Sequence, residues 1–338
     1  MISNMNTYRD KRTKLFIEKL LNEIDIEKES EKINCYVCKN EEFKIISKKD
    51  RYGLYYPTGI CIKCGNLQQA SYLRSESLNK FYESHYRNLY KTGSPEQLFL
   101  SQYFKAATKI ESFIGEIELK NILEIGSGPG GILKYFEHKK NSKVLGIDLD
   151  QRYLDYGIEN GLELINSDVE TFQSKNKYDL IIVCHVLEHL KNPGDLLKNL
   201  KSFLNEEGSI YIEVPSLESL KNGLYGGNFE AFRHLAHVSH FTEKSMRDLI
   251  YISGYKITNF NNSIQVLIKN TSNKVSQSKS FKYNSFESTE NLLIQIQNAK
   301  IKNSIILLIV YIYRTLKIKE FMNMVKIQFY KISYNLKK

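Results

Sequence analysis

The sequence lacks a hydrophobic run long enough to cross a membrane. Its longest apolar run, SIILLIVYIY at 304–313, is about half of the ~20 residues that a spanning helix needs. Residues 1–20 have no apolar stretch behind a basic start, so we expect no signal peptide. Cysteine is scarce, with five residues. In a chain without an export signal, we expect a cytoplasmic location and cysteines that bind metal rather than form disulfides.

A basic surface of the kind that nucleic acids attract is also missing from most of the chain. The net charge is +10, but residues 300–338 hold nine basic side chains and one acid and so contribute +8 of it. The rest of the chain is nearly neutral, and we do not expect nucleic acid as a partner. The tail mixes these lysines with apolar residues, which suits an amphipathic helix at the inner membrane face, a helix that completes the fold, or a dimer contact.

Six strand-like runs alternate with helical stretches between residues 121 and 262. They read NILEI, KVLGID, LELIN, YDLIIVCHV, SIYIEVP and YKITNF. This alternation predicts an α/β domain with a mainly parallel sheet. We expect six segments along the chain: an N-terminal helix (1–32), a zinc-binding unit (33–70), a helical cap (71–115), the α/β domain (116–268), a linker (269–290) and a basic amphipathic helical tail (291–338).

The first of these strands runs into a glycine-rich turn, Gly126-Ser127-Gly128-Pro129-Gly130-Gly131, and a helix begins near Ile132. Glycine lets a ligand approach the backbone, and ligands bind at the carboxyl ends of parallel strands. The spacing differs from the dinucleotide-binding pattern Gly-x-Gly-x-x-Gly, and Pro129 removes an amide that a pyrophosphate could use. Because Glu124 adds a carboxylate before the turn, we expect a cationic ligand.

Together these motifs resemble the class I S-adenosylmethionine-dependent methyltransferases, over roughly residues 100–262. The resemblance implies a Rossmann-like, mainly parallel seven-stranded sheet and S-adenosylmethionine as cofactor. It implies that the turn passes under the methionine part and that Glu124 orients it, that Asp148 binds the ribose hydroxyls, that Asp168 binds the adenine amino group and that Leu149 and Val169 flank the adenine ring. The implied cofactor-binding residues are Glu124, Gly126, Ser127, Gly128, Gly130, Asp148, Leu149, Asp168 and Val169. As an alternative, the two aspartates are plain turn residues or helix caps.

Two histidine-containing segments supply candidate catalytic groups. Cys184-His185-Val-Leu-Glu188-His189-Leu resembles the fourth-strand motif of the quinone-type and sugar-type methyltransferases, in which the strand end faces the methyl group. Neutral imidazole is a general base near physiological pH, so His185 is one candidate. In the alternative interpretation Glu188 and His189 only brace the next helix. A second alternative is an active-site metal ion, because His185-x-x-Glu188-His189 is similar to the metal-binding Glu-x-x-Glu-His of small-RNA 3′-end methyltransferases.

The second segment, His234-Leu-Ala-His237-Val-Ser-His-Phe, resembles His-Glu-His-Leu-Ser-Tyr-Phe-Ser of the sugar C-methyltransferases. His237 matches their candidate base, Ala236 stands where they carry glutamate, and His234 stands near their tyrosine. We therefore predict His237, His185 and His234 as catalytic candidates.

Four of the five cysteines form two Cys-x-x-Cys pairs, Cys35/Cys38 and Cys61/Cys64, separated by 22 residues. Two such pairs can supply four thiolates to one structural Zn²⁺ ion, and Gly65 relieves the turn after the last of them. A redox dithiol is the alternative. The following segment, 72–90, resembles the one after the zinc knuckle in methyltransferases of polysaccharide gene clusters.

From this resemblance we expect methyl transfer to a small-molecule or glycan acceptor, namely a sugar, nucleotide-sugar or lipid-linked glycan in surface polysaccharide biosynthesis. The alternatives are an RNA or quinone-type small-molecule O-methyltransferase and a catalytically inactive cofactor-binding scaffold.

Overall fold

The computed structural model describes residues 11–90, 93–169, 171–271 and 285–315, with side chains up to Ile301. The first ten residues of the predicted N-terminal helix, residues 272–284 of the predicted linker and residues 316–338 of the predicted tail lie outside the described residues. Among the described residues, no helix is long and apolar enough to cross a membrane.

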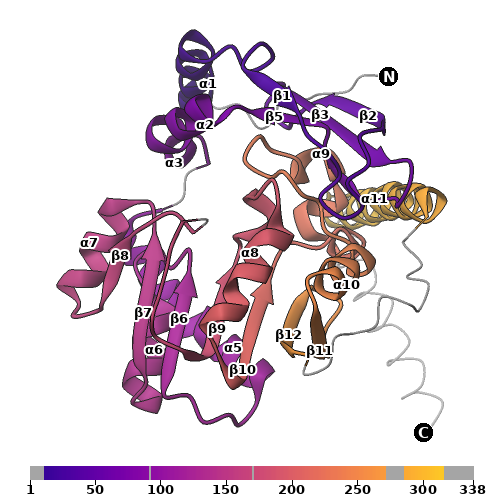
Figure 1. Cartoon of the computed structure of the whole chain (residues 1–338). Helices are drawn as coiled ribbons and strands as arrows, with labels where there is room; N and C mark the ends of the chain where they lie inside the picture. The colour runs from indigo at the N-terminus through magenta and orange to yellow at the C-terminus, as the bar shows by residue number, and fades with distance from the viewer. Residues whose placement is uncertain (1–10, 91–92, 170, 272–284, 316–338) are drawn as a thin grey trace, which may run out of the picture.

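A seven-stranded sheet forms the centre of the molecule, in the spatial order β11-β12-β10-β9-β6-β7-β8 (Figure 1). Its strands are β6 (Asn121–Ile125), β7 (Lys143–Asp148), β8 (Leu164–Asn166), β9 (Tyr178–Cys184), β10 (Leu204–Glu213), β11 (Tyr255–Phe260) and β12 (Gln265–Asn270). Only β12 runs antiparallel to its neighbours, β10 and β11, and the other adjacent pairs are parallel. The prediction of a mainly parallel seven-stranded sheet is confirmed.

The six predicted strand-like runs correspond to β6–β11, whereas β12 was not recognised as a separate strand. It reaches Asn270, inside the segment predicted as a linker. An antiparallel strand inserted between two others needs no helix before it, so the alternation of strands and helices gives no signal for it.

The strands bury both faces, which follows from their continuous apolar sequence. On one face Leu123 and Ile181 pack with α8 (Pro193–Leu200) and α10 (Glu243–Ile252). On the other face Ile122 and Leu180, each one position earlier, pack with α5 (Ala107–Ile114), α6 (Gly131–Lys140) and α7 (Gln151–Glu159). The two cores fix the strand register, and with it the set of residues that emerges at the carboxyl edge.

The N-terminal part lies at the carboxyl edge of the main sheet (Figure 1). It consists of α1 (Lys11–Glu23), the three-stranded sheet β2 (Phe43–Lys49), β3 (Tyr55–Cys61) and β4 (Leu67–Gln69), and the antiparallel pair β1 (Ser30–Lys32) and β5 (Ser71–Leu73). This arrangement places the four predicted metal-ligating cysteines on the same side of the molecule as the strand ends.

The predicted helical cap contains α2 (Ser75–Phe81), α3 (Arg87–Tyr90), α4 (Pro95–Ser101) and α5. Two π-helical turns interrupt it, Tyr82–Tyr86 between α2 and α3 and Gln102–Ala106 between α4 and α5. Such turns are rare and often occur at functional sites. At the start of α4 the Ser94 side chain accepts a hydrogen bond from the Gln97 amide in a capping box, with Pro95 as the first helical residue.

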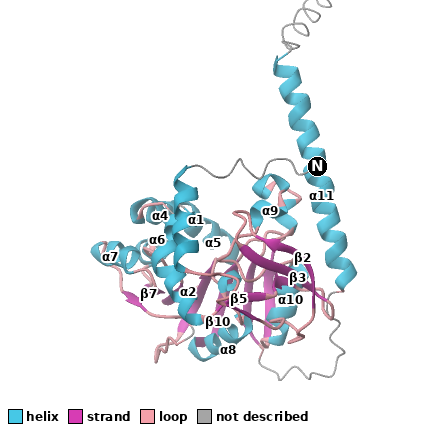
Figure 2. Cartoon of the chain, turned by 90° about the horizontal axis from the view of Figure 1, so that it is seen from above, coloured by secondary structure: helices cyan, strands magenta, loops and turns pink. Residues whose placement is uncertain are grey.

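The last described element is α11 (Phe286–Thr315), which begins against the second cysteine pair and extends away from the body (Figure 2). The Thr289 hydroxyl donates to the Gly65 carbonyl at 2.6 Å. A Cβ on Gly65, whose φ is +69°, would lie 2.3 Å from the Ser285 carbonyl oxygen. Glycine is therefore required there both for the turn and for the approach of α11.

Candidate functional site

The glycine turn joins β6 to α6 at the carboxyl edge of the sheet. Gly126, Gly128 and Gly130 all have φ between +55° and +77°. The Gly126 and Ser127 amides donate to the Ile147 carbonyl at 2.8 and 3.0 Å, which ties the turn to β7. Such a path needs residues without a side chain, so this local sequence folds into a tight turn at the strand tip.

The cap holds this turn through Gln102, which lies in the second π-helical turn. Its Nε2 donates to the Ser127 carbonyl at 3.1 Å, and its Oε1 accepts from the Gly131 amide at 2.9 Å. A Cβ on Gly131 would lie 2.2 Å from the Phe99 carbonyl oxygen. The cap therefore packs directly on the first turn of α6.

Glu124 and Asp148 lie at adjacent strand ends. Glu124 is 1% exposed, and its Oε2 has no hydrogen-bond partner among the described residues. Burial, followed by the negative charge of Asp148, raises the pKa of Glu124 well above its usual value. The Asp148 carboxylate accepts from the Gly128 amide at 2.8 Å and from the Asp150 amide at 2.9 Å. A cationic or hydrogen-donating ligand beside Glu124 would relieve its burial penalty.

The other predicted cofactor-binding residues lie along the same edge. β7 and β8 pair with Asp148 opposite Asn166, two residues before Asp168, and the Ser167 amide donates to the Asp148 carbonyl at 3.2 Å. Asp168 is exposed and its carbonyl accepts from the amides of the following turn. Leu149 is 59% exposed, and Val169 is half-buried. The structure thus brings Glu124, Asp148 and Asp168 to one edge of the sheet, while their binding roles stay predictions.

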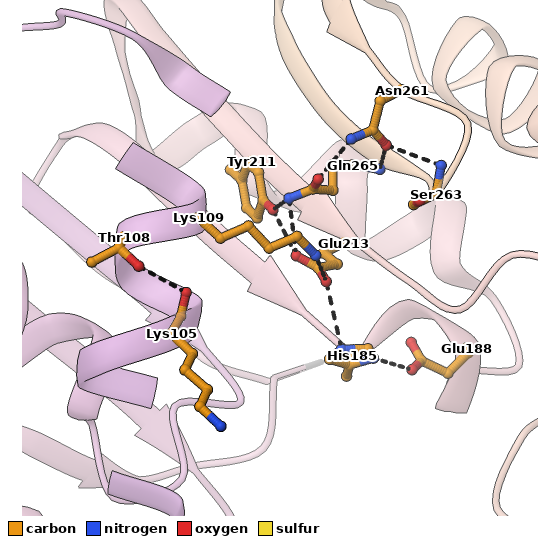
Figure 3. Close-up of polar contacts among 10 residues, drawn as sticks. All are labelled: Lys105, Thr108, Lys109, His185, Glu188, Tyr211, Glu213, Asn261, Ser263 and Gln265. Carbon is orange, nitrogen blue, oxygen red and sulfur yellow. Dashed lines mark hydrogen bonds and ion pairs between the residues drawn. The ribbon is translucent and has the colours of Figure 1, made fainter. Parts of the chain in front are cut away.

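His185 follows β9 with a φ of +55°, a left-handed conformation that is uncommon for histidine. Its Nδ1 lies 3.3 Å from Glu188 Oε1, and its Nε2 lies 4.0 Å from Glu213 Oε1 (Figure 3). Partial loss of hydration would lower the pKa of His185, but the hydrogen bond to Glu188 and the charges of Glu188 and Glu213 raise it above the usual value. His185 therefore lies between two carboxylates, with its side chain 58% exposed.

Glu213 at the end of β10 is itself held by three side chains (Figure 3). Lys109 of α5 donates to its Oε1 at 2.7 Å, Tyr211 donates to its Oε2 at 2.7 Å, and Gln265 donates to the same oxygen at 3.3 Å. Burial alone would raise the pKa of Glu213, but the Lys109 and Tyr211 hydrogen bonds lower it. Glu213 thus stays ionised. It connects Lys109 of the cap to the end of β10 and to His185 after β9.

His234 and His237 lie in the loop after α9 (Phe229–Phe232), and both are buried. Their ring centroids are 3.6 Å apart, and the ring of His189 lies 5.0 Å from that of His237. Burial lowers the pKa of all three rings, so they are neutral near physiological pH. The Nδ1 atoms of His234 and His237 have no hydrogen-bond partner among the described residues.

The N-terminal unit and the turn after β9 together fix this loop. Gln69 Nε2 donates to the carbonyls of Leu235 at 3.1 Å and His237 at 2.9 Å, and the Gln69 amide donates to Val238. The Glu188 carbonyl accepts from the Val238 amide at 2.7 Å and the Ser239 amide at 3.0 Å. The loop is therefore held between β4 and the strand end that carries His185.

Tyrosines of the cap line the other side of the histidine group. The ring of Tyr90 lies 4.6 Å from that of His234, and the rings of Tyr86 and Tyr82 lie 6.1 and 6.4 Å from that of His189. Tyr82 and Tyr86 are in the first π-helical turn. The Tyr90 hydroxyl is buried and also has no hydrogen-bond partner among the described residues.

The four paired cysteines converge, as their spacing predicts. Their sulfur atoms all lie within 4.8 Å of one another, with Cys35–Cys64 and Cys38–Cys61 at 3.5 Å. Thiolates at about 2.3 Å from a tetrahedral zinc ion stand about 3.8 Å apart, so the set fits such an ion. The two turns are alike: the amides of Lys39 and Gly65, both at positive φ, donate to the carbonyls of Cys35 and Cys61.

Several residues of this region were not predicted from the sequence. Gln102 and Gln69 act through contacts that bring together distant segments, and nothing in their local sequence marks them. Glu213 does carry a signal, because it is an acid at the end of an apolar strand, as Asp148 is.

Comparison with known proteins bears on the main sheet. Residues 99–259 match the family model described as a methyltransferase domain. A probable (S)-tetrahydroprotoberberine N-methyltransferase 2 of Papaver bracteatum is 30% identical over 103 residues, covering 28% of this chain and 28% of that protein. A ubiquinone biosynthesis O-methyltransferase of Aeromonas salmonicida is 29% identical over 103 residues, covering 28% of this chain and 43% of that protein.

Among solved structures, an S-adenosylmethionine-dependent methyltransferase from Clostridium acetobutylicum is similar, with 15% identity and a TM-score of 0.39, over 57% of this chain and 98% of that one. The matches to the two curated relatives span less than half of their lengths. Residues 99–259 match a methyltransferase domain, and the seven-stranded sheet, which β12 completes beyond the matched range, has the class I S-adenosylmethionine-dependent methyltransferase fold.

Proposed function

We propose that the protein transfers a methyl group from S-adenosylmethionine to a hydroxyl-bearing small molecule, in the first instance a sugar, nucleotide-sugar or lipid-linked glycan. The supporting observation is a set of buried polar atoms without hydrogen-bond partners among the described residues, beside the tyrosine rings of the cap. They are Glu188 Oε2, His234 Nδ1, His237 Nδ1 and Tyr90 Oη. Buried polar groups are normally paired, so these groups favour an acceptor with several hydroxyls.

The cofactor supplies an electrophilic methyl group on a positively charged sulfur. Glu124 offers an unpartnered buried carboxyl oxygen at the glycine turn, which suits a cationic ligand. Asp148 keeps lone pairs for ribose hydroxyls beyond the two amides that it accepts, and Asp168 is exposed at the neighbouring strand end. Catalysis would come mainly from the proximity and orientation of the two substrates.

In this proposal the acceptor oxygen would bond to the methyl carbon as the carbon–sulfur bond breaks, with neutral S-adenosylhomocysteine as the leaving group. A histidine would receive the proton that the acceptor hydroxyl loses. His237 is the first choice because its ring is neutral and its Nδ1 has no hydrogen-bond partner within the described part of the chain. His234 and His185 are the alternatives. We also propose that Cys35, Cys38, Cys61 and Cys64 hold a structural Zn²⁺ ion, whose role is to fix the unit that carries Gln69 and so the histidine loop.

Two measurements test the proposal. Calorimetric titration with S-adenosylmethionine should give saturable binding, and folded protein that releases no heat would argue against it. Incubation with cofactor and separate pools of nucleotide-sugars, quinone-type phenols and tRNA, followed by mass spectrometry, should show a methyl increment in the sugar pool. A methyl increment found only in the phenol or tRNA pool would show that the acceptor belongs to that class instead. No methyl increment in any pool would favour a catalytically inactive scaffold. His237→Gln should abolish transfer, whereas the exposed His138→Gln should not.

A further inference from the structure

Three side chains from two distant segments meet beneath the cap. Glu188 and His189 belong to the short turn after β9, and His237 belongs to the loop after α9. Each residue offers one ligand atom, and these three atoms all lie within 4.8 Å of one another. Glu188 is 1% exposed and His237 is 6% exposed. His189 is half-buried, so the group lies mostly below the protein surface.

The hydrogen bonds of these side chains leave lone pairs unused. Glu188 Oε1 contacts His185 Nδ1 at 3.3 Å, but Glu188 Oε2 has no hydrogen-bond partner among the described residues. His189 Nδ1 contacts the Ala236 carbonyl at 3.0 Å, which assigns the proton to Nδ1 and leaves Nε2 with a lone pair. His237 Nδ1 has no partner in the same part of the chain. Buried polar atoms without hydrogen-bond partners, such as Glu188 Oε2 and His237 Nδ1, are costly unless something binds them.

The backbone holds this geometry before any ligand binds. The Glu188 carbonyl accepts the amides of Val238 and Ser239, so the loop that carries His237 is attached to the turn that carries the other two groups. The hydrogen bond from His189 Nδ1 to the Ala236 carbonyl orients the ring, and metal-ligating histidines are commonly oriented by such a bond from the ring nitrogen that does not bind the metal.

We propose that Glu188, His189 and His237 bind a divalent transition-metal ion, zinc or a close relative, at a site separate from the four cysteines. Two imidazoles and one carboxylate form a three-ligand set, which leaves a coordination position open to water or substrate. Nitrogen-rich sets favour zinc, iron or cobalt, whereas Mg²⁺ prefers oxygen ligands. The cysteine set differs, because four thiolates close a site and leave no open position.

Such an ion would change the chemistry of the proposed methyl transfer. A hydroxyl bound at the open position loses its proton more easily. His237 would then be a ligand, and the proton would pass to His234, whose ring lies 3.6 Å from that of His237. The inference deepens the proposed function, but the binding of the ion can be measured without any acceptor.

The test counts metal in the full-length chain. Protein stripped with a chelator is loaded separately with Zn²⁺ and with Co²⁺, passed through a desalting column and analysed by elemental mass spectrometry. Wild type should retain one equivalent per chain more than Glu188→Gln or His237→Gln, and the exposed His138→Ala should match wild type. Glu188→Gln keeps the shape of the side chain, and circular dichroism checks that each variant is folded.

Equal metal content in wild type and in the folded Glu188→Gln and His237→Gln variants would overturn the proposal. Cys61→Ser separates the two sites, because the equivalent assigned to Glu188, His189 and His237 should remain in it. Metal binding that is intact in a protein that methylates nothing would contradict the proposed function alone.

Discussion

Gly126 allows the role of the glycine turn to be tested quantitatively. Its φ is +70°, and a Cβ there would lie 2.6 Å from Cγ2 of Val186. For alanine, the left-handed conformation costs about 1–2 kcal/mol, and pressing a methyl group into a packed position costs about 1–3 kcal/mol more. Gly126→Ala should therefore lower the free energy of unfolding by about 2–5 kcal/mol.

Gly128→Ala is the matched control for this change. Its φ is +55°, but the nearest atom to its Cβ would be Leu98 Cδ2 at 3.5 Å, an ordinary contact. Gly128→Ala should lower the free energy of unfolding only by the cost of the left-handed backbone conformation, about 1–2 kcal/mol. Urea denaturation of both variants gives the two free energies, and calorimetry with S-adenosylmethionine gives the accompanying change in affinity.

Val186→Ala identifies the cause of the larger loss. If the methyl group collides with Val186, removing the valine branches should cost less stability in the Gly126→Ala background than in wild type, because the clash disappears with them. Equal losses for Gly126→Ala and Gly128→Ala, together with an additive effect of Val186→Ala, would refute the reasoning.

Other expected outcomes follow from single features. Asp148→Asn should weaken S-adenosylmethionine binding by about 10- to 100-fold in calorimetry, the usual value of a hydrogen bond to a charged group; unchanged affinity would remove its proposed role. Burial lowers the pKa of His240 to about 3, so folding opposes its protonation: its contribution to stability is complete above its unfolded pKa and is lost as pH falls towards 3. At pH 4.5 the free energy of unfolding should be lower by about 3 kcal/mol because of this residue, and acid denaturation of His240→Gln should lack that decrease. Cys61→Ser should lower the melting temperature, and treatment of wild type with a chelator should do the same if zinc is bound. Flotation with anionic liposomes should recover the full-length chain but not a 1–290 truncation, and equal recovery would exclude membrane contact through the tail.

The sequence predicts those parts of the site that depend on neighbouring residues. The path of the turn follows from glycines at Gly126, Gly128 and Gly130, and the convergence of the cysteines follows from two short spacings that each close one turn. The edge that gathers Glu124, Asp148 and Asp168 follows from strand alternation, because parallel strands end on the same side.

What could not be predicted depends on contacts between distant segments. The bonds from Gln69 to the carbonyls of Leu235 and His237 span 166 and 168 residues, and a single sequence carries no signal for them. The meeting of Glu188 with His237 has the same origin. β12 was missed for a different reason, because it enters the sheet directly after β11 without a helix between them.

The hydrogen bonds from Gln69 of β4 to the loop after α9 connect the histidines of that loop to the cysteine-containing unit. Gln69 lies five residues after Cys64, and its side chain holds the backbone at His237. An oxidant that converts Cys35 and Cys64 to a disulfide would remove two of the four ligands of the proposed zinc ion and weaken the contact between Gln69 and the loop. We therefore expect oxidation of these cysteines to slow the proposed methyl transfer while the affinity for S-adenosylmethionine at the glycine turn stays unchanged.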